Sequence, residues 1–233
     1  CEFGIKAIKQ PVAFKPINMG DAINTTDGEY LPSITADGQT MIFTRRTNQR
    51  ENLYLSIKKD SKWVKARPLN DTLNTTFNEG AQCISQDGMY LFFAGCNRPD
   101  GLGRCDIYVS SREGDGWSKP FNIGTPINTA AWESQPSLSA DGRTLYFSSN
   151  RSGGIGGYDI WKSTLNTDAT WTEPVNMGPN INTAYDEQAP FIHADDQTLY
   201  FSSSGWPGLG KKDLFVSRLM PSGEWGVPVN FGY

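Results

Sequence analysis

Histidine is nearly absent from this chain of 233 residues, in which His193 is the only one. A histidine-based catalytic triad or a histidine-rich metal site therefore has too few members to be assembled. His193 itself falls beside a turn, at a repeat position that other copies fill with Thr35, Ser85 and Ser139. This position favours a turn residue over a catalytic base. The sequence predicts no catalytic residue, no metal site and no cofactor.

Long apolar runs and basic patches are also missing. No stretch approaches the ~20 apolar residues that are needed to span a bilayer. The 21 lysines and arginines are scattered, the 25 acidic residues outnumber them, and the pI is about 5.1. The chain therefore has no electrostatic footprint for nucleic acid. An aromatic content of 12% argues against disorder, and the length suits one or two domains with a sizeable core. We expect no transmembrane segment and no nucleic-acid partner.

An internal repeat is the strongest signal that is present. Tryptophan recurs every 54 residues, at Trp63, Trp117, Trp171 and Trp225. An acidic residue recurs at Glu29, Glu79, Glu133 and Glu187, and a third series runs Asn52, Asp106, Asp159 and Asp213. A two-residue turn recurs at Asp37-Gly38, Asp87-Gly88, Asp141-Gly142 and Asp195-Asp196. Four copies at one period indicate a solenoid, an array or a propeller.

Each repeat is a succession of short strands. In the third copy we expect strands at 134–139, 144–148, 159–163 and 171–176, with an Asp-Gly hairpin turn between the first two. The second run is apolar throughout, as expected for a strand that is covered on both faces. Pro32, Pro136 and Pro190 share one position in the first strand, and proline belongs on an edge strand because it lacks an N–H donor. The innermost strand of a blade is such an edge. The sequence therefore predicts an all-β protein, a β-propeller of four-stranded antiparallel blades.

The start of the chain repeats the sequence motif that ends the blades. Asn18-Met19-Gly20 and Ile23-Asn24 recur as Asn122-Ile123-Gly124 with Ile127-Asn128 and as Asn176-Met177-Gly178 with Ile181-Asn182. We expect a helix-like lead-in at 1–13 and a propeller at 14–233, which consists of a spare outer strand at 14–24 and blades at 29–78, 79–132, 133–186 and 187–233. A spare outer strand suits a five-bladed ring completed by strands beyond Tyr233. A four-bladed ring with one extra edge strand is the alternative.

The cysteines indicate a compartment. Cys96 ends the second strand of its blade and Cys105 begins the third, so antiparallel pairing brings them together across one loop. A disulfide there points to an oxidising compartment such as the periplasm, and two free thiols are the alternative. Cys83 is expected to be a buried thiol on an inner strand. Cys1 could be the lipid-bearing first residue of a lipoprotein, although the helix-like sequence behind it favours a boundary.

One rim of the propeller is the candidate binding face. The loops between second and third strands emerge on the same side as the connections between blades, and three of them are glycine-rich, at 101–106, 154–159 and 208–213. One aspartate per loop is a poor calcium cage and no helix follows to hold a phosphate, so we interpret these as structural loops. The aromatic and cationic residues that the repeat does not explain also gather on this rim: Phe77, Trp132, Tyr185, Trp206, Arg46, Arg104, Lys211 and Lys212. Such a mixture suits recognition of a protein or a glycan, or the aromatics only pack the connections between blades.

The run from Ser137 to Arg151, with Asp159-Ile160-Trp161 and the segment from Trp171 to Gly178, resembles the PD40 or TolB-like version of the WD40 propeller. More narrowly, Pro16 to Gly20 and Glu187 to Ser203 resemble the propeller segment of Bacteroidetes envelope proteins. In that family a tetratricopeptide segment precedes the propeller. A carboxypeptidase-regulatory-like domain and an OmpA-like peptidoglycan-binding domain follow it, and the family includes a component of the type IX secretion system.

The resemblance implies a non-enzymatic protein-interaction scaffold of the periplasm, associated with the outer membrane. Its expected partners are envelope proteins of the outer membrane or the secretion machinery, and peptidoglycan only through an OmpA-like domain whose motif this chain lacks. The alternative is a carbohydrate-binding or glycoside-hydrolase propeller, because the sequence around Asp141 also resembles the Asp-box of sialidases without its spacing. A cluster of carboxylates outside the repeat positions, at the channel mouth, would favour that enzyme.

Overall fold

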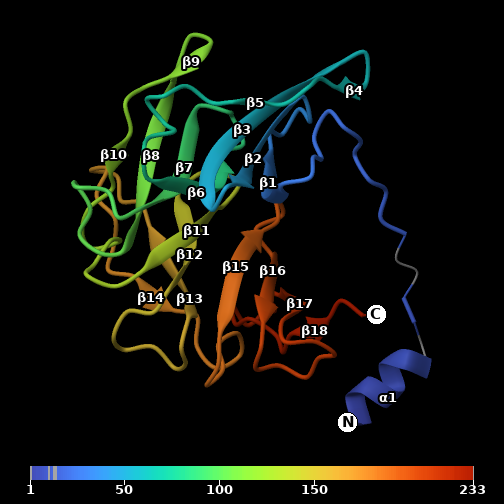
Figure 1. Cartoon of the computed structure of the whole chain (residues 1–233). Helices are drawn as coiled ribbons and strands as arrows, with labels where there is room; N and C mark the ends of the chain where they lie inside the picture. Colours follow the sequence, from blue (N-terminus) through green and yellow to red (C-terminus); the bar gives the residue numbers. More distant parts are fainter. Residues whose placement is uncertain (1, 10, 13–14, 233) are drawn as a thin grey trace.

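The computed structural model describes residues 2–9, 11–12 and 15–232 (Figure 1). The alternatives for Cys1 and the end of the chain at Tyr233 lie outside these residues. Helix α1 (Glu2–Lys9) falls within the expected lead-in. The remaining elements are strands, and the described part of the chain contains no helix that is both long and apolar enough to cross a membrane.

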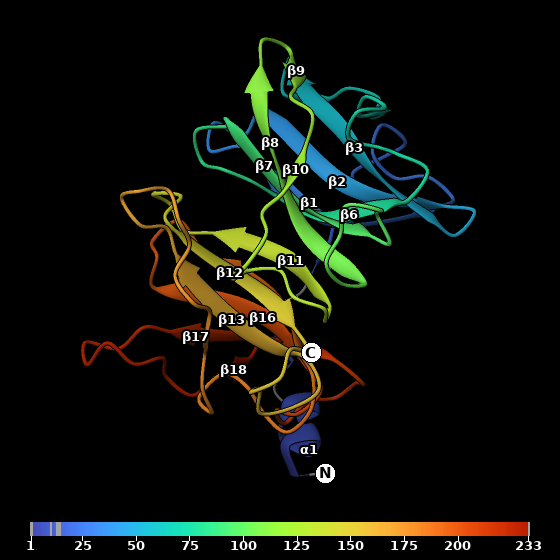
Figure 2. The same ribbon diagram turned by 90° about the vertical axis from the view of Figure 1, so that its left-hand side faces the viewer.

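The strands form four antiparallel sheets, which are the blades of a propeller (Figures 1 and 2). The first blade contains β1 (Gly28–Ile34), β2 (Thr40–Thr47), β3 (Arg50–Lys59), β4 (Lys62–Trp63) and β5 (Arg67–Pro68). The second contains β6 (Asn78–Ile84), β7 (Tyr90–Cys96), β8 (Cys105–Glu113), β9 (Gly116–Trp117) and β10 (Phe121–Asn122). The third contains β11 (Glu133–Leu138), β12 (Thr144–Ser149), β13 (Asp159–Thr164) and β14 (Val175–Asn176). The fourth contains β15 (Glu187–Ile192), β16 (Thr198–Ser203), β17 (Asp213–Arg218) and β18 (Val229–Asn230). The predicted fold class is confirmed.

The outer strand of the third blade is shorter than expected. In the third blade only Val175–Asn176 pairs as β14, whereas Trp171 forms an isolated bridge to Leu165. Pro174 lies between the bridge and β14, and proline cannot donate a ladder hydrogen bond. The other three expected strands of this blade are present within one residue at each end.

The repeated turns have the left-handed backbone that their sequence requires. Gly38, Gly88 and Gly142 have φ of 67°, 72° and 69°. In the fourth blade Asp196 takes the same conformation, with φ of 54°, and aspartate is one of the few residues with a side chain that tolerates it. A hairpin turn is thus confirmed at each Asp-Gly position, but the prediction of two-residue turns is wrong: the Thr35 N–H donates to the Thr40 carbonyl at 3.0 Å, which encloses four residues, and only the glycine has positive φ.

The first strand of each blade faces a central channel. Pro32, Pro136 and Pro190 line it together with Gln82, which replaces proline in the second blade. The register of each first strand slips by one residue just before this position, where the preceding residue has positive φ. The bulge bends the strand at the channel, as bulges commonly do in strands at a rim.

Apolar side chains from neighbouring blades interlock to form the core. Between the second and third blades, Phe92, Ile107 and Val109 contact Leu145 and Phe147 in one buried cluster. Similar clusters join the first blade to the second and the third to the fourth. Stacking between sheets is therefore what buries the central strands on both faces.

The expected spare outer strand is not formed. Residues 15–20 have no strand pairing, although Gly20 N–H donates to Asn18 Oδ1 at 2.8 Å, as Gly124 donates to Asn122 in the second blade. An outer strand pairs with the third strand of its own blade, as β14 pairs with β13. No such strand lies beside residues 15–20 in the described part of the chain. The expected partner is a third strand beyond Tyr233, so the spare outer strand stays a prediction.

One face of the fourth blade is uncovered. Leu214 is 62% exposed, whereas Leu53, Ile107 and Ile160, at the same position in the other blades, are fully buried. Phe191 and Phe231 are exposed on either side of Tyr200, with ring centroids 6.1 and 5.5 Å from that ring. In the other blades the next sheet covers the equivalent face. A fifth blade stays a prediction.

Candidate functional site

The three glycine-rich loops share one construction. A carboxylate at the start of each third strand folds back and accepts hydrogen bonds from the loop backbone. Asp106 accepts from the Leu102 N–H at 2.8 Å, Asp159 from the Ile155 N–H at 2.5 Å, and Asp213 from the Leu209 N–H at 2.9 Å. Burial raises the pKa of Asp106, and the N–H donors of Gly103 and Leu102 partly offset the rise.

The glycines in these loops are required by close packing. A Cβ on Gly103 would lie 2.1 Å from the Ala131 carbonyl oxygen, and one on Gly156 would lie 2.2 Å from the Tyr185 carbonyl oxygen. Both carbonyls belong to the connection that leads into the next blade. The loops of the second and third blades are therefore held against the neighbouring blade connection, which supports the expectation that loops and connections gather on one rim. At Gly210 in the fourth blade, the nearest atoms to a Cβ belong to Lys212 and Asp213 of the same loop.

Each of these loops presents an aliphatic side chain to solvent. The residue between the two glycines is exposed in all three blades, at 50% for Leu102, 44% for Ile155 and 38% for Leu209. We call these three residues the rim tips. They were missed at the sequence level, where only the glycines and the aspartate were considered. The available signal was the Gly-Leu-Gly or Gly-Ile-Gly triplet, which recurs in step with the repeat.

A buried network of ion pairs and hydrogen bonds supports the rim. Glu133 is fully buried, and its carboxylate accepts hydrogen bonds from the backbone and hydroxyl of Thr129 at 2.9 and 2.8 Å. Arg151 lies 3.3 Å from the same carboxylate and also donates to the Ile127 carbonyl. The corresponding pairs in the first and second blades are Arg45–Glu29 at 2.8 Å and Arg98–Glu79 at 3.2 Å.

The fourth blade departs from this pattern. Trp206 takes over one role of the arginine, because its indole N–H donates to the Ile181 carbonyl at 2.9 Å. Glu187 keeps its hydrogen bonds from Thr183 and Ser203, and the described chain supplies no cation beside it. Burial raises the pKa of Glu187 above its usual range, and these hydrogen bonds offset part of the rise.

The structure divides the predicted rim residues into two groups. Trp206 packs against the core, Trp132 meets Tyr158 edge to face at 4.9 Å between centroids, and Phe77 is half-buried. Tyr185 is 63% exposed. Four cations of the prediction are exposed: Arg46, Arg104, Lys211 and Lys212. Lys212 lies 3.6 Å from the Asp186 carboxylate. The rim therefore offers aliphatic tips, one tyrosine and cations, with most of its aromatics used for packing.

A disulfide joins Cys96 and Cys105, whose Cα atoms are 3.9 Å apart. It closes the loop of residues 97–104, which carries the tip Leu102 and the cation Arg104 on the same side of the propeller. Cys83 lies on β6 beside the channel with a free thiol, and burial raises the pKa of this thiol to about 11.

Replacing Cys96 and Cys105 by serine together should lower the free energy of unfolding by about 2–3 kcal/mol. Closing a short loop removes conformational entropy from the unfolded chain, and a loop of about ten residues gives a value in this range. Urea unfolding of the double variant beside the oxidised wild type measures the difference. A Cys83→Ser variant, which breaks no disulfide, should change stability by less than about 1 kcal/mol. Equal losses in both variants would contradict the expectation.

The carboxylates and the single histidine lie at structural positions. His193 is half exposed at the turn before β16, where its backbone N–H donates to the Thr198 carbonyl at 2.9 Å. Prolines, small polar residues and apolar residues line the channel. Among the described residues, no group of three histidine, cysteine or acidic side chains is placed to hold a metal ion.

A comparison with protein-family models finds no matching family, and a comparison with curated proteins finds no matching sequence. Solved structures do match. TolB from Acinetobacter baumannii superposes with a TM-score of 0.54 at 18% identity, over 86% of this chain and 45% of that one. A protein assigned as TolB from Agrobacterium tumefaciens gives 0.56 at 19%, over 84% and 62%. An α-L-arabinofuranosidase from Lactobacillus brevis gives 0.58 at 13%, over 90% and 75%. The chain spans 45% and 62% of the length of the two TolB chains. It is therefore similar to these proteins in its fold, a β-propeller of the kind found in TolB.

Proposed function

We propose that this chain is a non-enzymatic protein-interaction propeller, whose rim of loops between second and third strands binds a partner protein. The observation that carries the proposal is the set of rim tips Leu102, Ile155 and Leu209. The three tips stand at one position of the repeat, on loops that emerge on the same side of the propeller. Apolar anchors on a rigid surface, bordered by cations, are the arrangement found at protein interfaces.

The rim loops are preorganised in the unbound protein. Each tip is held by hydrogen bonds from its own backbone to a loop aspartate, and the loop of the second blade is closed by the disulfide. A rigid loop loses little conformational entropy when it binds, so more of the contact energy is available for affinity. The exposed Arg104 and Lys211 add positive charge beside the tips, which suits a partner with an acidic border, whereas Lys212 is paired with Asp186.

We further propose a periplasmic, outer-membrane-associated role, in which the propeller links outer-membrane or type IX secretion machinery to a cell-wall-anchored OmpA-like protein. The support is the sequence resemblance to the Bacteroidetes envelope family of which PorE is a member. The disulfide adds support, because disulfides persist in oxidising compartments such as the periplasm. Peptidoglycan would be reached only through an OmpA-like domain.

A carbohydrate-binding or glycoside-hydrolase propeller is the second candidate. The similarity in fold to an α-L-arabinofuranosidase favours it. The use of the carboxylates weighs for the scaffold: Glu29, Glu79, Glu133 and Glu187 each bind a threonine of the blade connection, and the loop aspartates bind loop N–H groups. These acids occupy the same position in every blade, as a structural network requires.

Affinity capture from an envelope extract tests the proposal, with glycans as competitors. A triple variant in which Leu102, Ile155 and Leu209 become serine should lose the retained envelope protein, because each lost apolar anchor costs about tenfold in affinity. The matched control changes three exposed apolar residues away from this rim to serine: Ile57, Met220 and Val227. It should retain the partner. If no protein is retained and the chain binds arabino-oligosaccharides or xylo-oligosaccharides, this proposal is wrong and the carbohydrate-binding propeller is the better candidate.

A further inference from the structure

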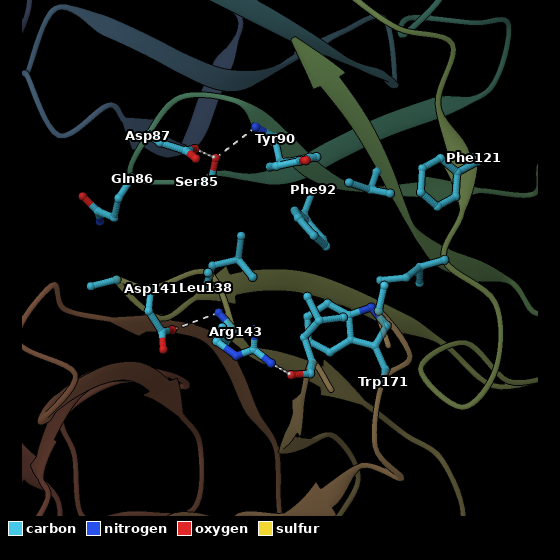
Figure 3. Close-up of a pocket in the computed structure, with 16 residues that line it drawn as sticks. Ser85, Gln86, Asp87, Tyr90, Phe92, Phe121, Leu138, Asp141, Arg143 and Trp171 are labelled. Carbon is cyan, nitrogen blue, oxygen red and sulfur yellow. Dashed lines mark hydrogen bonds between the residues drawn. The ribbon is translucent and has the colours of Figure 1, made fainter. Parts of the chain in front are cut away.

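A cavity of about 600 Å³ lies between the second and third blades, on the side of the propeller opposite the rim tips (Figure 3). Phe92 from β7 and Trp171 from the connection to β14 meet edge to face at 6.4 Å between centroids. Phe121 borders one end and is 60% exposed. Asp87 and Asp141, from the turns of the two blades, lie on opposite sides of the other end (Figure 3). The volume and the mixture of an apolar floor with a few polar groups are those of ligand sites.

This cavity is a property of one junction and not of the repeat. Trp117 and Trp225 occupy the position of Trp171 at the neighbouring junctions and are buried, at 6% and 8% exposure. Trp171 remains half-buried because part of its ring faces the cavity. The repeat therefore supplies an aromatic residue here that neighbouring side chains leave partly uncovered.

In the described part of the chain, no side chain joins the two turns at the mouth of the cavity, whereas one joins those of the next junction. At the next junction, Asp196 Oδ1 accepts a hydrogen bond from the Ala140 N–H at 2.8 Å and so ties the turns of the third and fourth blades together. The corresponding residue at the cavity is Gly142, which has no side chain to reach Gln86 in the turn of the second blade. Gly142 and Asp196 have similar backbone, with φ of 69° and 54°. No hydrogen bond from the turn of the second blade can be accepted by a side chain at this position, because glycine has none.

The mouth of the cavity is acidic. Asp87 and Asp141 accept hydrogen bonds through Oδ1 from Ser85 and Ser139, which hold the pKa of each carboxyl below its usual range. Their Oδ2 atoms have no hydrogen-bond partner among the described residues. The one cation of the lining, Arg143, donates to the Leu165 carbonyl, so the lining carries two carboxylates and one guanidinium.

We infer that this cavity binds an extended peptide segment of a partner protein, through a bulky apolar side chain next to a basic residue. The apolar side chain lies on Phe92 and Trp171, and the lysine or arginine beside it faces Asp87 and Asp141. The acidic mouth distinguishes this occupant from an acidic or phosphorylated segment, which the carboxylates would repel. The inference rests on the proposed protein-interaction function and gives it a second contact, on the side opposite the rim tips.

Peptide titration with the full chain tests this inference. The probes are capped hexapeptides with a central phenylalanine, leucine or alanine, flanked by two lysines or two glutamates. Amide chemical shifts in heteronuclear NMR spectra report both the site and the affinity. We expect the lysine-flanked phenylalanine and leucine peptides to shift the amides of Ala140, Gly142 and Ala169. The alanine peptide should bind about tenfold more weakly, because it lacks the anchor.

The decisive variant is Gly142→Asp, which recreates the bridge seen at Asp196. No atom lies within 4 Å of a Cβ at this position, so the variant should fold normally. Gly38→Asp makes the same change in the turn of the first blade, where φ is 67°, and is the matched control. We expect Gly142→Asp to weaken peptide binding about tenfold or more and Gly38→Asp to leave it unchanged. If the peptide were attracted by charge alone, the added carboxylate of Gly142→Asp would make it bind more tightly. Binding inside the cavity and attraction by charge alone therefore predict opposite changes in peptide affinity.

The other occupants are outcomes that overturn the inference. One is that arabino-oligosaccharides shift the same amide resonances and the peptides do not bind. The other is that these resonances shift as the protein concentration rises, which reports self-association, and the peptides do not bind. Unchanged peptide affinity in Gly142→Asp overturns it as well. The variant that lacks the rim tips separates this inference from the proposed function. If the peptides do not bind but capture of the envelope protein still depends on the rim tips, only the cavity inference is rejected. If the peptides bind but capture does not depend on the tips, only the proposed role of the rim is rejected.

Discussion

Replacing Glu133 by glutamine should lower the free energy of unfolding by about 3–5 kcal/mol, because the change leaves the buried guanidinium of Arg151 without its counter-charge. The Glu133 side chain is fully buried and that of Arg151 is 9% exposed, so water cannot replace the lost carboxylate. Equilibrium unfolding in urea at pH 7 measures the loss. We expect circular dichroism and tryptophan fluorescence to report the same shift.

Glu187→Gln is the matched control for this prediction. Glu187 occupies the same repeat position but has no arginine beside it, so its replacement should cost about 1 kcal/mol or less. Similar losses for the two variants would contradict the view that the ion pair, and not the hydrogen bonds from threonine, dominates this position.

The same control carries a pH dependence whose sign follows from the raised pKa of Glu187. A raised pKa means that the folded protein retains this proton at pH values where the unfolded chain has lost it. Its contribution to stability is therefore complete below the unfolded pKa of about 4.5 and is lost as the pH rises through the folded pKa. Relative to wild type, Glu187→Gln should be more stable at pH 7 than at pH 4. An identical difference at both values would contradict the sign.

Replacing Gly156 by alanine should destabilise the third blade by about 2–4 kcal/mol. The new Cβ would lie 2.2 Å from the Tyr185 carbonyl oxygen and 2.3 Å from that of Thr183, and both are backbone atoms that cannot move without displacing the connection to the fourth blade. Thermal and urea unfolding measure the loss. Hydrogen exchange should be faster in residues 150–158 and 183–187 than elsewhere.

Gly28→Ala is the control for that loop. No atom lies within 4 Å of a Cβ at Gly28, and its backbone is not left-handed. Alanine there should change the free energy of unfolding by less than about 1 kcal/mol. A loss at Gly28 as large as that at Gly156 would show that glycine is needed for chain conformation in general and not for this close approach.

The repeat made the fold predictable from sequence. The Asp-Gly turns and the prolines on the channel recur in three copies and the apolar second strands in all four, and local backbone preference fixes each of these signals. The spare outer strand at 14–24, which rests on the same reasoning, stays a prediction. Its residues repeat the sequence motif of β10 and β14, and Asn18 makes the same turn hydrogen bond. A strand also needs a partner strand beside it, and the described residues supply none at this position.

The site was less predictable because it depends on contacts between blades. Trp206 looked like a free rim aromatic, yet it donates to the Ile181 carbonyl in place of an arginine, a substitution that sequence order alone does not reveal. The exposure of Leu102, Ile155 and Leu209 follows from loop aspartates that turn the tips outward. The cavity beside Trp171 depends on how side chains of the second and third blades meet, which the sequence of a single repeat does not reveal.

Site-specific photo-crosslinking at a rim tip tests the central claim most directly. A photoreactive phenylalanine derivative replaces Ile155 in cells that produce the protein, and the same derivative at Ile57 is the control. The account predicts that irradiation links the Ile155 variant to one protein of discrete mass and leaves the Ile57 variant unlinked. Adducts of equal yield at both positions, or none at Ile155 while the folded protein is present, would contradict the assignment of this rim as the protein-binding surface.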